Sequence, residues 1–165
     1  MATRVQFRRG TTSEHSSFTG AVGEVTVDTD KDVVVVHDGS TAGGKPSPSL
    51  STAQTFTGAQ KGAVTTLTSS SNATAIDLSL NNFFTITLSE STTFGAPTNA
   101  VAGQAGSIFI VQDSSGNHTG SFHSNFKFTG GADPTLTTTA NAVDRIDYVV
   151  KSSTEIHAVA TLALA

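Results

Sequence analysis

The sequence predicts a mainly β protein: a small N-terminal β-hairpin module with one short helix, then an antiparallel sandwich or jelly-roll-like domain. Two observations lead to this fold class. The 165-residue chain has ten Phe, and its Val, Ile and Thr residues gather in short runs that alternate apolar and polar positions. Ser and Thr exceed a quarter of the chain, and its net charge is only −4. A disordered Ser/Thr-rich segment would have fewer aromatic and β-branched residues and more net charge, so a β protein with a Thr-rich surface is favoured.

The first block, residues 1–43, begins with a strand and a helix. Apolar and polar residues alternate over 4–8, the period of a half-buried strand. Thr11 and Glu14 then have the spacing of a capping box, which predicts a short helix over 12–18.

A hairpin and a linker follow the helix. "GEVTVDTDKDVVVVHDG" predicts strands at 24–28 and 33–37 around a polar turn, and the Gly-, Pro- and Ser-rich residues 44–54 predict a linker. The second block, 55–165, has turn signals at the spacing of a β sandwich. Its expected strands are 63–68, 74–80, 83–89, 107–112, 121–128, 143–151 and 154–163.

The first block is too small to bury a core alone. Domains of about 40 residues usually need disulfides, a metal or oligomerisation. The chain has no cysteine, so oligomerisation or packing on the second block remains. Only 13% of the residues are charged, and charge-poor surfaces tend to associate, which also indicates an oligomer.

Arg4, Arg8 and Arg9 lie close together in a chain with only nine Lys and Arg. Phosphate binding is disfavoured, because the other basic residues are scattered and no aromatic platform for bases accompanies the arginines. The same block holds the acids Glu24, Asp28, Asp30, Asp32 and Asp38. Arginine grips carboxylates in a bidentate fork, so ion pairing within or between subunits is favoured over nucleic-acid binding.

Candidate metal sites fail on spacing. Asp28, Asp30 and Asp32 are spaced like calcium ligands, but an EF-hand loop needs Gly at its sixth position and Glu at its twelfth, where Val33 and Gly39 stand. None of the five histidines has metal-ligand spacing with another. We therefore expect no metal and no cofactor.

Signals of an enzyme, of secretion and of a membrane span are also missing from the sequence. It contains no GxSxG elbow, no phosphate-binding loop and no distinct carboxylate pair, so we expect no enzyme. "MATRVQFRRG" lacks the apolar core of a secretion signal, and "IHAVATLALA" is shorter than the roughly 20 residues that span a membrane. Together with the lack of cysteine, this predicts synthesis in a reducing cytoplasm.

The first block resembles the small N-terminal module of bacteriophage tail fibres and of the phage major tropism determinant. The resemblance is carried by "RVQFRRGTTSEHSSFTGAVGEVTVDTDKDVVVVHDG", with its R-x-Q-x-R-R-G-T start, G-E, D-T and final D-G. Members of that family often have a Trp in the helix and another after the D-G. This chain has His15 and Gly44 near those places, so its packing there is expected to differ.

The second block is similar to a module of phage fibre and other virion proteins, through "NNFFTITLSESTTFGAPTNAVAGQAGSIFIVQDSSGN" and "TLTTTANAVDRIDYVVKSSTEIHAVA". That resemblance implies a homotrimer, with three chains around one axis. It places the first block at the trimer interface or at its contact with the next virion part. The expected interface or anchoring residues are Arg4, Gln6, Arg8, Arg9, Glu24 and Asp28.

We therefore expect a non-enzymatic structural protein of a bacteriophage virion, on the virion surface and made in the host cytoplasm. The chain is short, which favours a homotrimeric capsid decoration protein over a fibre. The alternative is a short tail fibre or adaptor that binds a host-surface glycan through loops near His118, His123 and Asp133. Its partners would be other copies of itself and the major capsid protein or tail proteins, with no nucleic acid and no membrane.

Overall fold

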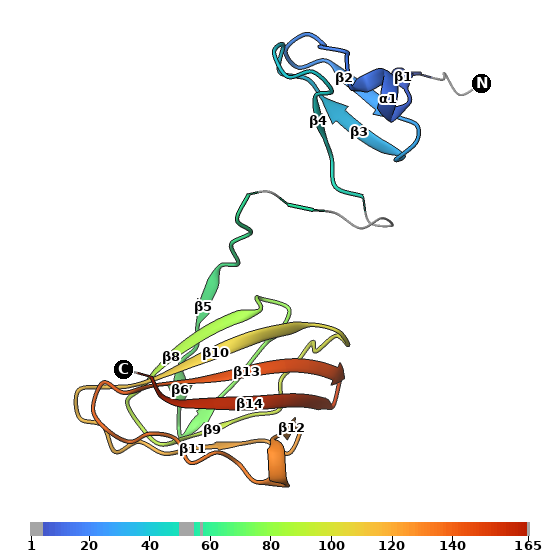
Figure 1. Ribbon diagram of the computed structural model, residues 1–165. Coiled ribbons are helices and arrows are strands. Elements are labelled where there is room, and N and C mark those ends of the chain that lie inside the picture. The colour runs from blue at the N-terminus through green and yellow to red at the C-terminus, as the bar shows by residue number, and fades with distance from the viewer. Residues whose placement is uncertain (1–4, 50–54, 57, 165) are drawn as a thin grey trace. The chain divides into compact units, whose positions relative to one another are not determined.

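The computed structural model describes residues 5–49, 55–56 and 58–164. The chain divides into two compact units, Met1–Gln60 and Lys61–Ala165 (Figure 1). Strands dominate both units, and the only α-helix among the described residues is a single turn, so the prediction of a mainly β protein is confirmed.

The first unit is built on one four-stranded sheet in the order β1-β2-β3-β4. Its strands are β1 (Arg8–Gly10), β2 (Val25–Asp28), β3 (Val33–Val36) and β4 (Lys45–Pro46). β2 and β3 form the predicted antiparallel hairpin, and β1 runs parallel to β2. β4 lies inside the predicted linker, 44–54, and it is an edge strand, where a sheet tolerates proline.

The predicted capping box is present at α1 (Thr12–His15). The Glu14 backbone N–H donates to Thr11 Oγ1 at 3.2 Å, and the Thr11 N–H donates to Glu14 Oε2 at 2.7 Å. The helix is shorter than the predicted 12–18, because the Phe18 N–H donates to the His15 carbonyl in a tighter turn that ends it.

Between α1 and the sheet lies a directional chain of hydrogen bonds through two buried histidines, His15 and His37, which are 6% and 1% exposed. The Gly20 N–H donates to His37 Nδ1 at 3.3 Å, so in the neutral ring Nε2 carries the proton and donates to Thr26 Oγ1 at 2.9 Å. The Thr26 hydroxyl donates to His15 Nε2 at 2.8 Å, and His15 Nδ1 donates to the Thr11 carbonyl at 3.0 Å. Every ring nitrogen is thereby satisfied without a water molecule.

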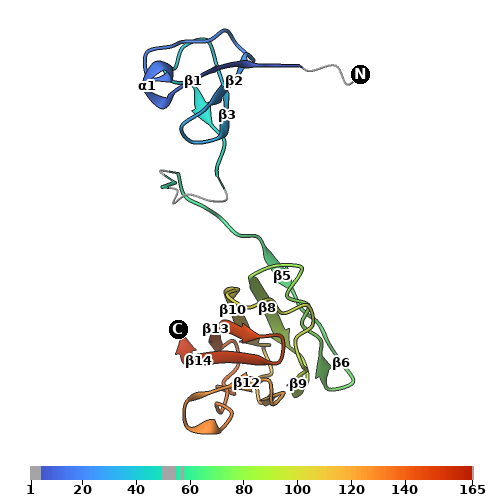
Figure 2. The ribbon, with the colours of Figure 1, turned by 90° about the vertical axis from the view of Figure 1, so that its right-hand side faces the viewer.

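The second unit is a sandwich of two sheets (Figure 2). The larger sheet has the order β12-β14-β13-β10-β8-β5 and the smaller one β11-β9-β7-β6. The strands of the larger sheet are β5 (Val64–Thr66), β8 (Phe83–Leu88), β10 (Ala105–Gln112), β12 (Phe126–Lys127), β13 (Val143–Ser152) and β14 (Glu155–Leu164). Those of the smaller sheet are β6 (Ser69–Ser70), β7 (Ala73–Thr74), β9 (Thr92–Phe94) and β11 (Gly120–Phe122).

Strand pairing in the sandwich is mixed, whereas antiparallel pairing was predicted. β13 pairs antiparallel with β10 and β14, so the last two expected strands, 143–151 and 154–163, form a hairpin. β8, however, runs parallel to β10 and β5, and β9 runs parallel to β7 and β11. The reason is that the chain alternates between the sheets: it leaves β8 for β9 in the other sheet and returns to β10, a crossover that makes neighbouring strands parallel.

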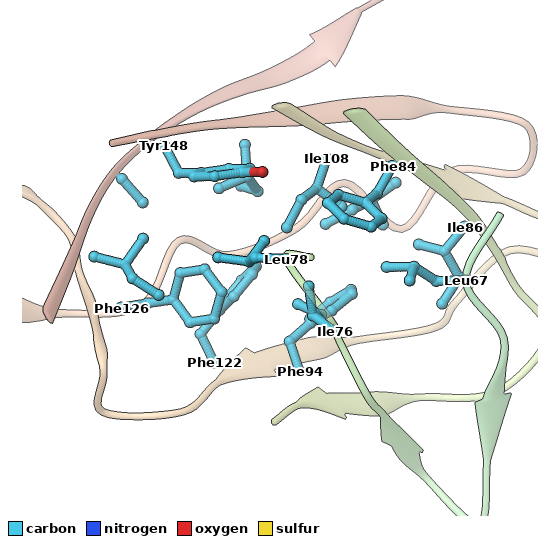
Figure 3. Packing of buried hydrophobic residues seen from close by; sticks show 14 of the residues in the cluster. Leu67, Ile76, Leu78, Phe84, Ile86, Phe94, Ile108, Phe122, Phe126 and Tyr148 are labelled. Carbon is cyan, nitrogen blue, oxygen red and sulfur yellow. The ribbon is translucent and has the colours of Figure 1, made fainter. Parts of the chain in front are cut away.

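The core of the sandwich forms where the two sheets face each other (Figure 3). Phe84 and Ile108 project from the larger sheet, and Phe94 and Phe122 from the smaller one. The rings of Phe94 and Phe122 stack with centroids 4.8 Å apart. Phe126 is also buried in this core and Phe128 packs against it, whereas Phe83 and Phe109 stand at outward positions of the larger sheet.

Replacing Thr26 with Val should unfold or loosen the first unit. Valine has the same shape but no hydroxyl, so His15 Nε2 and His37 Nε2 would both be buried without a partner, at a cost of about 3 kcal/mol. Hydrogen exchange of the β2 and β3 amides measures the effect. The control is Thr19→Val at an exposed threonine of the same unit, which should leave protection unchanged. Equal protection in the Thr26 and Thr19 variants would refute the structural role of the hydroxyl.

Candidate assembly surface

One face of the first unit's sheet carries valine side chains that the described residues of the unit cover only in part. Thr26 points to the helix side of β2, so its neighbours Val25 and Val27 project from the opposite side. They lie directly opposite Val36 and Val34 in β3. We call these four residues the valine face. Val34 and Val36 are 44% and 45% exposed, which is unusual for adjacent valines in the middle of a sheet.

Two basic residues flank the valine face. Arg9 is in register with Val27, and Lys45 is in register with Val36. With the Gln6 amide oxygen turned toward it, the Arg9 guanidinium donates to that oxygen at 2.6 and 3.2 Å. Lys45 Nζ lies 3.3 Å from Asp38 Oδ2. The surface is therefore an apolar strip with positive charge on both sides.

Asp38 belongs to the D-G pair of the sequence motif and closes the turn before β4. Its Oδ1 accepts hydrogen bonds from the backbone N–H groups of Thr41 at 2.7 Å and Ser40 at 3.0 Å. These bonds, with those from the Thr41 hydroxyl and Lys45, hold the pKa of the Asp38 carboxyl well below its usual value. The charged carboxylate thus keeps Lys45 at the side of the valine face.

The predicted interface residue Arg8 lies on the helix side of the sheet, since it is in register with Thr26. It forms an ion pair with Glu24 inside the chain, at 2.9 Å, and its guanidinium stacks 4.9 Å from the centre of the Phe18 ring. For Arg8, the ion pair predicted for the arginines is thus formed with Glu24 inside a single chain.

The other predicted interface residues lie apart from that pair. Asp28 is 3% exposed and closes the hairpin turn by accepting from Thr12 Oγ1 at 2.7 Å and from the Asp30 N–H at 3.0 Å. Burial raises the pKa of Asp28, but these bonds and one from the Lys31 N–H outweigh it and lower the pKa overall. Arg4 lies outside the described residues.

Each of the three residues of the predicted receptor loops has a polar contact within the chain. Asp133 Oδ2 accepts from the Phe122 N–H at 2.8 Å, and His123 Nδ1 accepts from the Asn125 N–H at 3.2 Å. His118 Nε2 lies 3.2 Å from Asp113 Oδ1. Glycan binding through these loops stays a prediction.

Two buried polar residues that hold the loops were not singled out from the sequence. Gln112, 2% exposed, accepts from the His118 N–H at 3.1 Å and donates to the His118 carbonyl at 2.8 Å. Asp144, 3% exposed, accepts from the Thr137 N–H at 2.7 Å and the Ala163 N–H at 2.8 Å. The signal available in the sequence was a polar residue at an inward position of an alternating strand.

Metal-binding groups were searched for across residues 5–49, 55–56 and 58–164, and no three side chains of the ligating types gather there. Over the same residues, no helix has the length and apolar character needed to cross a membrane.

Comparison with known proteins confirms both resemblances stated from the sequence. The family model described as "Major tropism determinant N-terminal domain" matches residues 5–41, and the model "Putative phage tail fibre C-terminal domain" matches residues 68–152.

One curated relative is the "Tail fiber receptor-binding protein" of Bordetella phage BPP-1, 57% identical over 76 residues. The match covers 46% of this chain and 20% of the relative, so the chain spans about a fifth of that protein's length. Among solved structures, the Major Tropism Determinant I1 variant is 67% identical over 27% of this chain and 12% of that one, with a TM-score of 0.27. The M1 variant is 28% identical over 94% of this chain and 31% of that one, with a TM-score of 0.30.

The stability of the first unit should depend on pH through the protonation of Asp38. Because its pKa is lower when folded than when unfolded, its contribution to stability is present above about pH 4 and is lost as the pH falls further. Hydrogen exchange of the β3 amides between pH 6 and pH 2.5, corrected for intrinsic rates, should show this loss. The Asp38→Asn variant should be less protected at pH 6 and show a shallower decline. A decline as steep as that of the unsubstituted chain would assign the acid sensitivity to other carboxylates.

Proposed function

The chain belongs to the phage tail fibre C-terminal domain family, whose model covers just over half of it, and from this we propose that it is a structural subunit of a phage tail. In this proposal it is a short tail fibre or a tail adaptor, carried on the tail surface of the virion, and it catalyses no reaction. The capsid decoration expected from the short chain finds no support in the comparisons, which favour the tail fibre alternative.

The observation that carries the assembly role is the valine face. The first unit keeps two half-exposed valines in the centre of its sheet, in a chain without cysteine to staple so small a module. Burying a whole aliphatic side chain contributes about 1.5–3 kcal/mol, so covering the exposed halves of Val34 and Val36 contributes about 1 kcal/mol each. We propose a homotrimer in which three valine faces cover one another around a common axis.

Charge at the sides of the valine face suits contact with a further protein. In the proposed trimer, Arg9 and Lys45 would surround the covered valines, and the start of the chain, with Arg4 and Gln6, would reach the next part of the tail. Arg8 and Glu24 are already paired to each other and would hold β1 against β2 rather than contact a partner. The proposed partners are therefore other copies of this chain and an adjoining tail protein.

The tail location is tested by labelling intact particles of the encoding phage with gold-conjugated antibodies. We expect label confined to the tail, because the family model that covers half of the chain is named for a tail fibre and the relative from Bordetella phage BPP-1 is named a tail fibre receptor-binding protein. Label spread over the head would overturn the tail proposal and restore capsid decoration.

The homotrimer is tested by light scattering after size exclusion. The unsubstituted chain should elute at three times 16.9 kDa, and Val34→Glu should shift it to a single copy, because the carboxylate would be buried among valines without a partner. The matched control is Val22→Glu, at a valine of the same unit that is 82% exposed and lies outside the sheet. Circular dichroism should confirm that both variants remain folded. A trimeric Val34 variant would exclude the valine face as the contact.

A further inference from the structure

The larger sheet of the second unit also has a side turned away from the core, here called the outer face. Strand alternation places Phe109 at its centre, with Phe83 and Val111 on neighbouring positions. Val64, Val149 and Val159 are also on this face and are 54%, 53% and 61% exposed.

Polar residues separate these apolar side chains: Phe109 lies opposite Thr85 and Arg145, and Ser107 and Asp147 stand between Phe83 and Val159. The most exposed apolar side chains thus lie at the two sides of the face, and exposed aliphatic groups of this kind suit contact with another protein surface.

Most charged groups on the outer face are paired within one copy. Arg145 grips Asp147 Oδ2 through Nε at 3.0 Å and a terminal nitrogen at 2.8 Å, while the Ser107 hydroxyl donates to Asp147 Oδ1 at 2.6 Å. At the hairpin end, Lys151 Nζ lies 2.8 Å from Glu155 Oε1.

Lys127, in β12 on the same face, donates to the Ser124 carbonyl at 2.6 Å rather than to a carboxylate, so the face keeps one positive charge beside its two ion pairs. A copy that covers the face must leave that charge at the rim, in water.

The two sides of the outer face differ in shape. On the β14 side, β12 pairs only with Ile156 and His157 and then leads into the turn Thr129–Gly131. A groove of about 510 Å³ lies there, with Phe128 on one wall and Val149 and Val159 on the other. On the β5 side, Val64 stands at the opposite end of the sheet and is 54% exposed.

The groove and Val64 lie on the same level of the sheet. Val64 is in register with Phe83, Phe83 with Ser107, Ser107 with Asp147, and Asp147 with Val159. Four strand spacings separate Val64 from Val159, about 19 Å. A ring of copies in which Val64 of one meets the groove of the next would therefore close without a shift along its axis.

The face is too small to hold two copies together alone. A face about 19 Å wide and about 20 Å long has roughly 400 Å² of area, half of the roughly 800 Å² per partner in a stable two-body interface. In a ring, its two sides would meet two different neighbours, and the face would add to the contact made by the valine face.

We propose that the outer face of the second unit lines the axis of the trimer, with Val64 and Phe83 of each copy seated in the Phe128–Val159 groove of the next copy. This inference rests on the proposed homotrimer and adds a second contact surface to it, independent of the valine face.

Engineered disulfides test the contact directly, because the chain has no cysteine of its own. The variant carrying both Val64→Cys and Val159→Cys, mildly oxidised, should give covalent dimers and trimers on a non-reducing gel. Within one copy the two sites are about 19 Å apart, too far for a disulfide, which needs Cα atoms within about 7 Å. Each single substitution should give no cross-link, and neither should Val64→Cys combined with Val101→Cys, in a loop valine of similar exposure.

Light scattering on the same reduced samples separates this inference from the trimer on which it rests. A trimeric mass without cross-linking of the double variant would overturn the outer-face contact and leave the trimer standing. Covalent dimers from Val159→Cys alone would show a two-fold contact and also overturn it. A mass of 16.9 kDa would remove both proposals.

Discussion

The hydroxyl group of Thr26 determines which side of the small sheet is closed. By bridging His15 and His37 it ties α1 and the end of β3 to one side of β2. Alternation along the strand then directs Val25 and Val27 to the other side, where the described residues of the unit cover them only in part. The module is thus organised around a polar chain of hydrogen bonds, which fixes positions but buries little apolar surface. The apolar residues on the other side of the sheet remain available for contact between copies. The hydrogen bonds, rather than a large hydrophobic core, give the sheet its defined structure.

Local signals in the sequence were enough to predict the elements whose cause is local. The capping box of Thr11 and Glu14, the β2–β3 hairpin and the β13–β14 hairpin each follow from residues a few positions apart. The strand expected at 74–80 is the counterexample, because regular pairing there is limited to Ala73–Thr74. Asp77 accepts from the Ser79 N–H and turns the chain, and the apolar Ile76 and Leu78 that suggested a strand are core residues of a loop.

Features that depend on distant residues could not be predicted. The parallel pairing of β8 with β10 arises because β9 lies in the opposite sheet, and no local pattern records which sheet a strand joins. The candidate surface shows the same limit. The arginine cluster indicated ion pairing, and Arg8 does pair with Glu24, but the exposed valines were read only as a strand. A "VVVV" run gives no sign of which alternate pair lacks cover, since that depends on the place of α1.

The low charge of the chain connects its two apolar faces. The valine face and the outer face belong to separate units, and the outer face, at roughly 400 Å², has about half the area of a stable two-body interface. Once one face has joined the copies, however, the second contact becomes intramolecular and is favoured by a high effective concentration. Charged side chains buried in this second contact would have to lose their hydrating water, at a cost in free energy. The ion pair between Arg145 and Asp147 within each copy lowers that cost. Two apolar surfaces on one chain would in this way hold the proposed trimer more firmly than either alone.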